Sequence, residues 1–382
     1  MAQRYPSFVD LGWDPRAFLQ RLDTEFVIQH RDTLRFHSFG ELLRANDDQW
    51  RICQDLLKAI ILGGRVRRVY LKSRKKGIST FLLALQDDLA RHCPGFNGAV
   101  LSHTTEGTDI LIRNLESMHA NMDGFATTSS EVADGPGKVK KRLFTVETPV
   151  PDFGRPIAGR ASTIAFATAR GMNPFIGSTL SFVHVSELGR LQLTPQKVVQ
   201  LMTALLNAVP PNGPSVVVFE STAQGVGNAF HDYWKTAERN VKDGRVPRDG
   251  EFVPVFLPAY TDKGHRQPIE PGYNWMDWDA KDLIRENALV RDLNVPLEYL
   301  RWRRNKIQEI KFDFRQYQED FPDRPEDAFL ASGTGVIDPQ WIDRARGHIK
   351  QPAHYDWSVE VAHAPFGSDA VSIIGRGDEG LA

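Results

Sequence analysis

Residues 71–80 read LKSRKKGIST and carry groups that could bind a triphosphate. A phosphate loop of the form G-x-x-x-x-G-K-[ST] holds phosphates with its backbone N–H groups and with the N-terminus of the following helix. Its Lys neutralises charge, and its Ser or Thr ligates Mg²⁺. In this sequence Gly77 matches the second Gly, but Ile78 stands where the Lys should be and Lys72 where the first Gly should be. The stretch therefore reads as a variant of the loop.

The positive charge of this loop can come from its beginning, and we expect Lys72 to supply it. Arg74 and Lys76 are close enough in sequence to contribute. Ser79 keeps the hydroxyl that would ligate Mg²⁺, and Thr80 is a second candidate. The alternative is a basic turn in which Ser79 caps the helix that follows.

A second group of candidate residues ends the apolar run LSFVHVSE at residues 180–187. In ATPases of this layout the corresponding strand usually ends in Asp-Glu: the Asp holds Mg²⁺ through water, and the Glu polarises the attacking water. Here Ser186 replaces the Asp and can bond a metal-bound water without charge. Strand alternation places Ser186 and Glu187 on opposite faces, unless the strand ends at Ser186. The alternative is that Glu187 opens the next helix, where a carboxylate is favourable.

A third apolar run, VVVFESTAQG at residues 216–225, also ends in small hydroxyl residues and a Gly. Ser221 and Thr222 can sense a phosphate or relay its loss to a moving element. The alternative is a capped turn into the next helix. Phosphate loop, acid and hydroxyl sensor follow one another in the order of helicase-like P-loop ATPases.

Strands and helices that could position these groups alternate along the chain. We expect helices over residues 47–62, 79–91 and 108–118, and strands over 68–71, 98–102, 180–185 and 216–219. Residues 1–60 read as mostly helical, 123–160 as an insertion or hairpin, 258–330 as helical, and 357–374 as strand-like. The alternation predicts a parallel sheet with crossover helices, which binds ligands beyond the carboxyl ends of its strands.

Composition narrows the class of protein. The 382 residues include 47 Lys and Arg against 48 Asp and Glu, and 41% are hydrophobic, so we expect folded cores and only local basic surfaces. Basic residues cluster over 65–76, 138–142 and 301–306. No apolar run approaches the roughly 18 residues of a membrane span, and the first ten residues lack the apolar core of a secretory signal. Cys53 and Cys93 cannot form a disulfide framework or a four-thiolate zinc site, which fits a reducing cytoplasm.

Four segments together resemble one family. They are KSRKKGIST at residues 72–80, HVSE at 184–187, ESTAQGVGNAF at 220–230 with Trp234, and the series WRR at 302–304, YQEDFP at 317–322 and EDAFLASG at 326–333. On these motifs, which span about residues 46 to 335, the chain resembles the large terminase subunit of tailed bacteriophages, the DNA-packaging motor.

The resemblance implies a ring-forming ATPase that uses ATP and Mg²⁺ to drive double-stranded DNA into a procapsid. It implies a portal protein and a small terminase subunit as partners, action in the bacterial host cytoplasm and transiently at the procapsid portal, and no membrane. Gln49 would contact adenine, Lys72, Gly77 and Ser79 would hold the triphosphate and Mg²⁺, and Glu187 would activate water. The full set of expected residues is Gln49, Lys72, Ser73, Lys76, Gly77, Ile78, Ser79 and Thr80 for the nucleotide, Ser79 and Ser186 for the metal, Glu187 for catalysis, Arg74 or Arg170 as arginine finger, and Ser221, Thr222 and Ala223 for coupling to movement.

The family also joins an RNase H-like nuclease with two metal ions to this ATPase. SVEVAHAPFGSD at residues 358–369 resembles the first nuclease strand, but Ala362 stands where the family has a metal-binding Asp. Glu360 and Asp369 are not obvious substitutes. The sequence ends about twenty residues later, before the further carboxylates that a two-metal site needs. We therefore expect no nuclease activity from this chain.

We thus predict an α/β protein with a P-loop NTPase sheet of the RecA or helicase-like kind, flanked by helices. The predicted regions are an N-terminal helical region at 1–60, the ATPase core at 61–257, a helical linker or lid at 258–335, and the first strands of an RNase H-like domain at 336–382. Two alternatives stay open: another helicase-like P-loop ATPase, and a packaging assembly component that does not hydrolyse nucleotide.

Overall fold

The computed structural model divides the chain into two compact units, Met1–Ser332 and Gly333–Ala382. The residues it describes are 7–24, 27–28, 41–42, 45–120, 126–134, 139–147, 162–169, 175, 177–278, 280–311, 313–330, 356–362 and 370–376. The four predicted regions remain a prediction, because the division into two units does not test the boundaries inside the first.

The first unit is built on a sheet of eight strands: β3 (Arg65–Lys72), β4 (Asn97–Ser102), β5 (Ala126–Asp134), β6 (Val139–Glu147), β7 (Ser162–Thr168), β8 (Phe182–Ser186), β9 (Ser215–Ser221) and β10 (Val253–Leu257). Their order in the sheet is β10-β3-β9-β8-β4-β7-β6-β5. From β10 to β7 all neighbours are parallel, while β5 and β6 form an antiparallel hairpin. The predicted parallel sheet and the hairpin within 123–160 are confirmed.

Strand β9 lies between β3 and β8, so the three strands whose ends carry the candidate site residues are neighbours in the sheet. In the register, Leu71 of β3 pairs with Ser221 of β9, and Ser186 of β8 pairs with Glu220 of β9. Because these strands are parallel, their carboxyl ends emerge on the same side of the sheet. The phosphate loop, the acidic strand end and the hydroxyl strand end are therefore neighbours in space.

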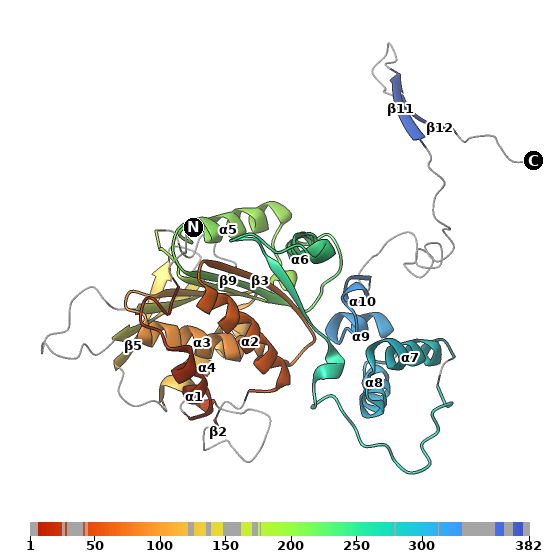
Figure 1. Cartoon of the computed structure of the whole chain (residues 1–382), viewed down its shortest axis with the longest axis horizontal. Coiled ribbons are helices and arrows are strands. Elements are labelled where there is room, and N and C mark those ends of the chain that lie inside the picture. The colour runs from red at the N-terminus through yellow and green to blue at the C-terminus, as the bar shows by residue number, and fades with distance from the viewer. Residues whose placement is uncertain are drawn as a thin grey trace, which may run out of the picture. The chain divides into compact units, whose positions relative to one another are not determined.

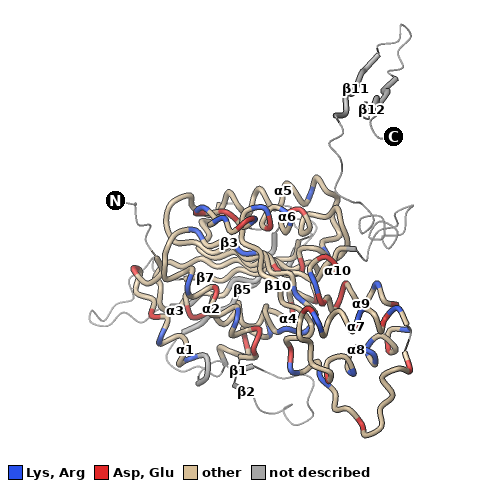
Figure 2. Tube along the Cα trace, turned by 45° about the vertical axis from the view of Figure 1, so that its right-hand side comes forward, with Lys and Arg blue, Asp and Glu red and all other residues tan. Residues whose placement is uncertain are grey.

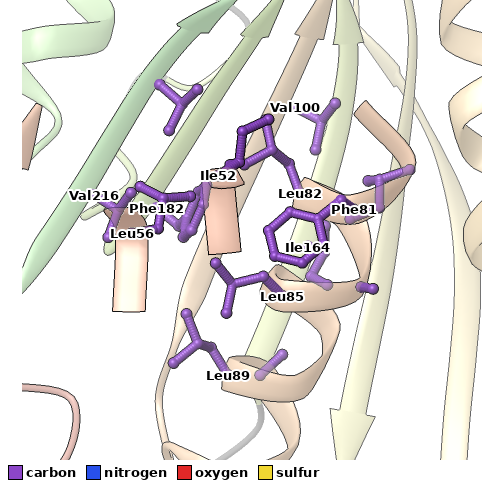
Figure 3. Close-up of a cluster of buried hydrophobic side chains, with 14 of the residues drawn as sticks. Ile52, Leu56, Phe81, Leu82, Leu85, Leu89, Val100, Ile164, Phe182 and Val216 are labelled. Atoms are coloured by element: carbon purple, nitrogen blue, oxygen red, sulfur yellow. The ribbon is translucent and has the colours of Figure 1, made fainter. Parts of the chain in front are cut away.

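Helices cover both faces of this sheet (Figure 1). One face carries α1 (Pro15–Thr24), α2 (Asp47–Leu62), α3 (Ile78–His92) and α4 (Thr105–Ala120), and the other carries α5 (Pro195–Asn207) and α6 (Ala229–Val241). The apolar stripe of α3, with Phe81, Leu82, Leu85 and Leu89, packs against strand residues such as Ile164 (Figure 3). Burial of such side chains stabilises the fold by roughly 1.5–3 kcal/mol each and holds α3 against the sheet.

Helix α2 has the predicted bounds, because its ends carry strong sequence signals. Asn46 accepts a hydrogen bond from the backbone N–H of Gln49, whose side chain accepts one from the Asn46 N–H, and Gly63 closes the helix at a φ of 81°. The expectation that residues 1–60 are mostly helical is only partly right. The structure places a short antiparallel pair, β1 (Val27–Ile28) and β2 (Glu41–Leu42), between α1 and α2.

Residues 258–330, called the helical region below, are helical as predicted from residue 280 on, whereas residues 262–278 form turns and irregular structure. The helical region holds a short 3-10 helix (Ala259–Thr261), α7 (Ala280–Leu293), α8 (Leu297–Glu309), α9 (Phe314–Asp320) and α10 (Pro325–Leu330). A core of its own gathers around Tyr299, Leu300 and Tyr317. Figure 2 shows Lys and Arg positions beside Asp and Glu positions around α8 and α9.

The second unit contains two described strands, β11 (Asp356–Ala362) and β12 (Ala370–Arg376), which pair antiparallel. The strand-like pattern predicted for residues 357–374 is confirmed over residues 357–362 and 370–374, and residues 363–369 lie outside the described residues. Ala362 ends β11 and pairs with Ala370, and Glu360 lies two residues earlier on the same strand, whereas Asp369 is outside the described residues. That this chain has no nuclease activity remains a prediction. In the part of the chain that the structure describes, no helix has the length and apolar character needed to cross a membrane.

Candidate nucleotide-binding site

The loop between β3 and α3 presents the free N-terminus of a helix. Gly77 is the N-cap of α3 and adopts a left-handed backbone with φ of 67°, and no side chain within the described residues caps this helix end. A Cβ on Gly77 would lie 2.7 Å from Gln49 Nε2, so the Gln49 side chain would have to move, and the left-handed φ favours glycine at this position. The first N–H groups of α3 are thus available to an anion. The alternative reading, in which Ser79 caps the helix, is wrong.

A pocket of about 270 Å³ lies in front of this helix end. Its walls come from the loop, from the end of β8 and from the start of α4. The residues that line it include Lys72, Lys75, Gly77, Ile78, Ser79, Thr80, His103, Asn114, Ser186 and Glu187. Of the eight residues predicted to bind nucleotide, six line the pocket, Lys76 among them. The other two, Gln49 and Ser73, do not.

Lys72, the last residue of β3, is held between two carboxylates. Its Nζ lies 2.6 Å from Glu220 Oε2 and 3.1 Å from Glu187 Oε1, and its side chain is 9% exposed. Burial alone would lower the pKa of Lys72, but Glu187 and Glu220 outweigh burial and keep the pKa above its ordinary value. The ammonium is therefore charged, beside the pocket, and already paired with acids.

Glu220, the penultimate residue of β9, is the site residue that sequence reasoning missed. Its side chain is fully buried, and its Oε1 accepts hydrogen bonds from Ser79 Oγ at 2.6 Å and Ser186 Oγ at 2.7 Å. His184 Nε2 lies 3.3 Å from the same oxygen. Burial alone would raise the pKa of Glu220, but Lys72 and His184 more than offset burial and hold the pKa below its usual range. A lone acid in the otherwise apolar run SVVVFES was the available signal.

Glu187 does not follow the strand alternation, which is the case that the sequence analysis allowed if the strand ends at Ser186. Strand β8 ends at Ser186, and Glu187 adopts a left-handed backbone with φ of 57°. It does precede a short 3-10 helix, Leu188–Arg190, but its side chain makes no capping bond there. Its Oε2 instead accepts hydrogen bonds of 3.3–3.5 Å from Ser221 and Thr222, and its Oε1 faces Lys72. The strained backbone turns the carboxylate toward the pocket.

The predicted coupling residues join this carboxylate to the 3-10 helix that follows it. Ser221 Oγ accepts a hydrogen bond from the backbone N–H of Gly189 at 3.1 Å, and Thr222 Oγ1 accepts one from Arg190 Nε at 3.1 Å. A Cβ on Gly189 would lie 2.9 Å from Ser221 Oγ and 3.2 Å from the Thr222 carbonyl oxygen, so the absence of a side chain eases this close approach. Ala223 is buried in the core on the α5 and α6 side of the sheet.

Of the two candidate arginine fingers, the structure describes Arg74 but not Arg170. Arg74 Nε lies 2.7 Å from Asp320 Oδ1, and the Arg74 N–H donates to the Asp320 carbonyl at 2.8 Å, so Arg74 is tied to the end of α9. Arg190 Nη2 lies 3.0 Å from the same Asp320 oxygen. Arg170 is outside the described residues.

The polar groups of two predicted nucleotide ligands, Lys76 and Gln49, bond instead to other parts of the protein and hold the loop in place. Lys76 Nζ is fully buried, 2.5 Å from Asp48 Oδ2 and 3.3 Å from Thr261 Oγ1. Gln49 Nε2 donates to the Gly77 carbonyl at 2.7 Å. Both side chains fasten the loop to α2 and to the helical region, and their predicted contacts with nucleotide remain predictions.

The oxygen atoms at this site suit Mg²⁺. The hydroxyls of Ser79 and Ser186 both reach Glu220 Oε1, so two hydroxyls and one carboxylate converge beside the pocket. Hard oxygen ligands, few from protein and the rest from phosphate and water, are what Mg²⁺ prefers in nucleotide sites. The residues present therefore fit the metal that the sequence analysis expects, and the roles of Ser79 and Ser186 in holding it remain predictions.

The fold and the placement of these groups are those of the P-loop NTPase fold: a parallel sheet, a glycine-ended loop leading into α3, and acids at the neighbouring strand ends. The sequence matches no model of a known protein family and no curated protein.

Solved structures similar to this chain include three phage large terminases. A variant ATPase domain from Thermus phage P74-26 aligns at 14% identity and a TM-score of 0.42, over 78% of this chain and 99% of that one. The large terminase of bacteriophage HK97 aligns at 11% identity and 0.49, over 97% of this chain and 66% of that one. A large terminase of a thermophilic bacteriophage in complex with ADP aligns at 12% and 0.36, over 82% of this chain and 60% of that one. They belong to the family that the sequence motifs resemble.

Proposed function

We propose that this chain hydrolyses ATP and is a motor subunit of the phage large terminase type, which moves double-stranded DNA into a procapsid. The observation that carries the proposal is the convergence of Lys72, Ser79 and Glu187 on one pocket at the N-terminus of α3. An ammonium for phosphate, a hydroxyl for Mg²⁺ and a carboxylate for water are the working parts of a P-loop ATPase.

Binding would begin at the free end of α3. Its first N–H groups and the Lys72 ammonium offer positive charge to the phosphates, and Gly77 lets the backbone approach them closely. To contact a phosphate, the Lys72 ammonium must give up at least one of its contacts with Glu187 and Glu220. Nucleotide binding therefore competes with two ion pairs, and it frees the Glu187 carboxylate for chemistry.

Hydrolysis would depend on Glu187. Mg²⁺, when held by Ser79 and Ser186, would neutralise charge on the phosphoryl oxygens. Glu187 stands at the pocket wall with an oxygen that can accept a hydrogen bond from the attacking water and orient it. Its second oxygen stays anchored by Ser221 and Thr222, which keeps the acting oxygen in place.

Coupling would use the same anchor. Loss of the terminal phosphate would shift Glu187 and, through Thr222 and Arg190, the Asp320 carboxylate at the end of α9. This chain of contacts runs from the pocket to the helical region and supports the coupling role of Thr222, and Ser221 supports it through its bonds to Glu187 and Gly189. The coupling role of Ala223 rests on the sequence resemblance alone. Arg74, now paired with Asp320, would have to leave it to serve as an arginine finger.

The DNA-related part of the proposal comes from the sequence resemblance and from the basic stretch at residues 138–142. Contacts from such a stretch to the DNA backbone would weaken with salt, because they release counterions. A portal protein, a small terminase subunit and further copies of the chain in a ring would be its partners, in the bacterial cytoplasm and at the procapsid.

The test is ATP hydrolysis with and without Mg²⁺ and with and without double-stranded DNA, with supercoiled DNA added to report cutting. We expect Mg²⁺-dependent hydrolysis that DNA stimulates, and DNA that stays double-stranded and uncut. Unwinding of the duplex would favour another helicase-like ATPase. Nucleotide binding without hydrolysis, even with packaging partners, would favour an assembly component.

A further inference from the structure

Ser186 leaves a chemical gap at the end of β8. ATPases of this layout place a carboxylate there, because a negative group helps to hold Mg²⁺ beside the phosphates. A serine hydroxyl can share the hydrogen bonds of metal-bound water but brings no charge. A site with Ser79 and Ser186 as its only protein oxygens would rely on neutral hydroxyls for a divalent cation.

Glu220 lies next to that gap. The β8–β9 register pairs Ser186 directly with Glu220, and the Glu187 N–H donates to the Glu220 carbonyl at 2.8 Å, which locks the two strand ends together. The Glu220 carboxylate then reaches across the strands, with Oε1 2.7 Å from Ser186 Oγ and 2.6 Å from Ser79 Oγ. One carboxylate oxygen thus touches both hydroxyls that are expected to hold the metal.

The charge of Glu220 also needs an explanation. A fully buried carboxylate is costly unless a cation accompanies it. In this structure the cation is Lys72, at 2.6 Å, yet Lys72 is the group that would have to turn to the phosphates when nucleotide binds. With Lys72 so engaged, Glu220 would keep only hydroxyls and His184 as neighbours among the contacts described. A divalent cation beside Ser79 would replace the charge that Lys72 withdraws.

We infer that Glu220 supplies the carboxylate of the Mg²⁺ site that Ser186 lacks, brought in from the neighbouring strand. The inference rests on the proposed ATPase function and adds a metal-holding residue that the sequence motifs did not indicate. Lys72 and Mg²⁺ exchange places as the partners of Glu220 between the empty and the nucleotide-bound site. A purely structural Glu220, which only positions Lys72, would give no such link to the metal.

The experiment measures the affinity of a fluorescent ATP analogue in Mg²⁺ and in EDTA, for the wild type, Glu220→Gln, Ser186→Asp and the double variant. The ratio of the two affinities isolates the contribution of the metal. We expect Glu220→Gln to reduce the Mg²⁺ enhancement by about 10- to 100-fold, the range for partners that support a metal site. Affinity in EDTA should be kept or raised, because Lys72 is released. Adding Ser186→Asp should restore the enhancement, since it returns a carboxylate to the strand end.

Glu238→Gln on α6, where Glu238 contacts Trp234 and Lys235, controls for the chemical change, and thermal unfolding checks that each variant is folded. Equal loss of affinity in Mg²⁺ and EDTA would mean that Glu220 only positions Lys72, and an unchanged Mg²⁺ enhancement would mean that it does not serve the metal. Either result overturns the inference while the ATPase proposal stands. A wild type that binds no nucleotide under any condition would overturn both.

Discussion

Two of the buried clusters of charge in the described part of the first unit are built differently. The site cluster, Lys72 with Glu187 and Glu220, borders an open pocket and uses a single ammonium as a point charge. The linker cluster lies in the helical region, where Glu286 is gripped by two arginines. Arg304 donates to Glu286 from Nε at 3.1 Å and Nη2 at 2.6 Å, and Arg303 donates from Nη1 at 3.2 Å.

The surroundings of the two clusters match this difference. Aromatic rings lie over the linker cluster: Trp275 is 4.9 Å from the Arg304 guanidinium, and Tyr317 is 5.3 Å from that of Arg303. The site cluster is surrounded by hydroxyls instead. A guanidinium fork fixed by rings stabilises one arrangement, whereas a lysine between two acids can change partners. The geometry thus suits a proposed catalytic role for the site cluster and a structural role for the linker cluster, although the sequence motifs run through both regions.

The largest expected effect is on turnover by Glu187→Gln. The amide keeps the shape of the side chain but cannot polarise water, so hydrolysis should fall by about 10²- to 10⁴-fold while nucleotide still binds. Steady-state hydrolysis and equilibrium binding of an ATP analogue measure the two effects separately. Unchanged turnover would remove Glu187 from its role and leave the site cluster without a catalytic group.

The opposite pattern is expected for Glu286→Gln in the linker cluster. The change leaves two buried guanidinium groups without their shared carboxylate, and the free energy of unfolding should fall by about 3 kcal/mol. Urea denaturation measures this loss. At a temperature where the variant is folded, nucleotide affinity should equal that of the wild type. A stable variant that no longer binds nucleotide would erase the contrast between the clusters.

A smaller effect separates two lysines of the same loop. Lys72→Ala removes the buried ammonium and should weaken binding of an ATP analogue by about tenfold or more, the range for a hydrogen bond to a charged group. Lys75 also lines the pocket but is exposed, so water screens its charge and Lys75→Ala should cost less. Titrations with a fluorescent nucleotide compare them. Equal losses would contradict the assignment of Lys72 as the lysine of this loop.

The smallest effect concerns pH and the helical region. Burial, and to a lesser degree Asp323, raise the pKa of Asp327 to about 6. Because the folded carboxyl holds its proton more tightly than the unfolded one, this group destabilises the fold above about pH 6, and the destabilisation is relieved as pH falls toward 4. Asp327→Asn should raise stability at pH 8 by up to about 2 kcal/mol and little at pH 4. Thermal unfolding across this range checks it; an equal gain at both pH values would refute the cause given.

Local patterns predicted much of the fold. Helix α2 was predicted with its observed bounds, and α3 was predicted to within one residue at each end, because its apolar stripe from Phe81 to Leu89 has helical spacing. Strand β10 was not predicted because Pro254 argues against a strand; it lies at the edge of the sheet, where a missing N–H is tolerated. Strand β7, with its small residues STIAFAT, was not predicted either, because it lacks a marked alternation.

The site was predictable only where one strand end suffices. Lys72, Ser79 and Glu187 each follow from the type of residue at the end of one element. The proposed role of Glu220 depends on the pairing of β9 with β8, which places Glu220 opposite Ser186. Strand periodicity carries no information about which strands are neighbours. The pairing of Lys76 with Asp48 and of Arg74 with Asp320 likewise depends on tertiary contacts between distant segments.

The most direct test of the account is a crystal structure of the chain with Mg²⁺ and a non-hydrolysable ATP analogue. The account predicts phosphates against the N-terminus of α3, with Lys72 Nζ turned toward them from Glu220 and Mg²⁺ beside Ser79. Nucleotide bound elsewhere, or bound at α3 with Lys72 still in contact with both acids and no metal near Ser79, would contradict it.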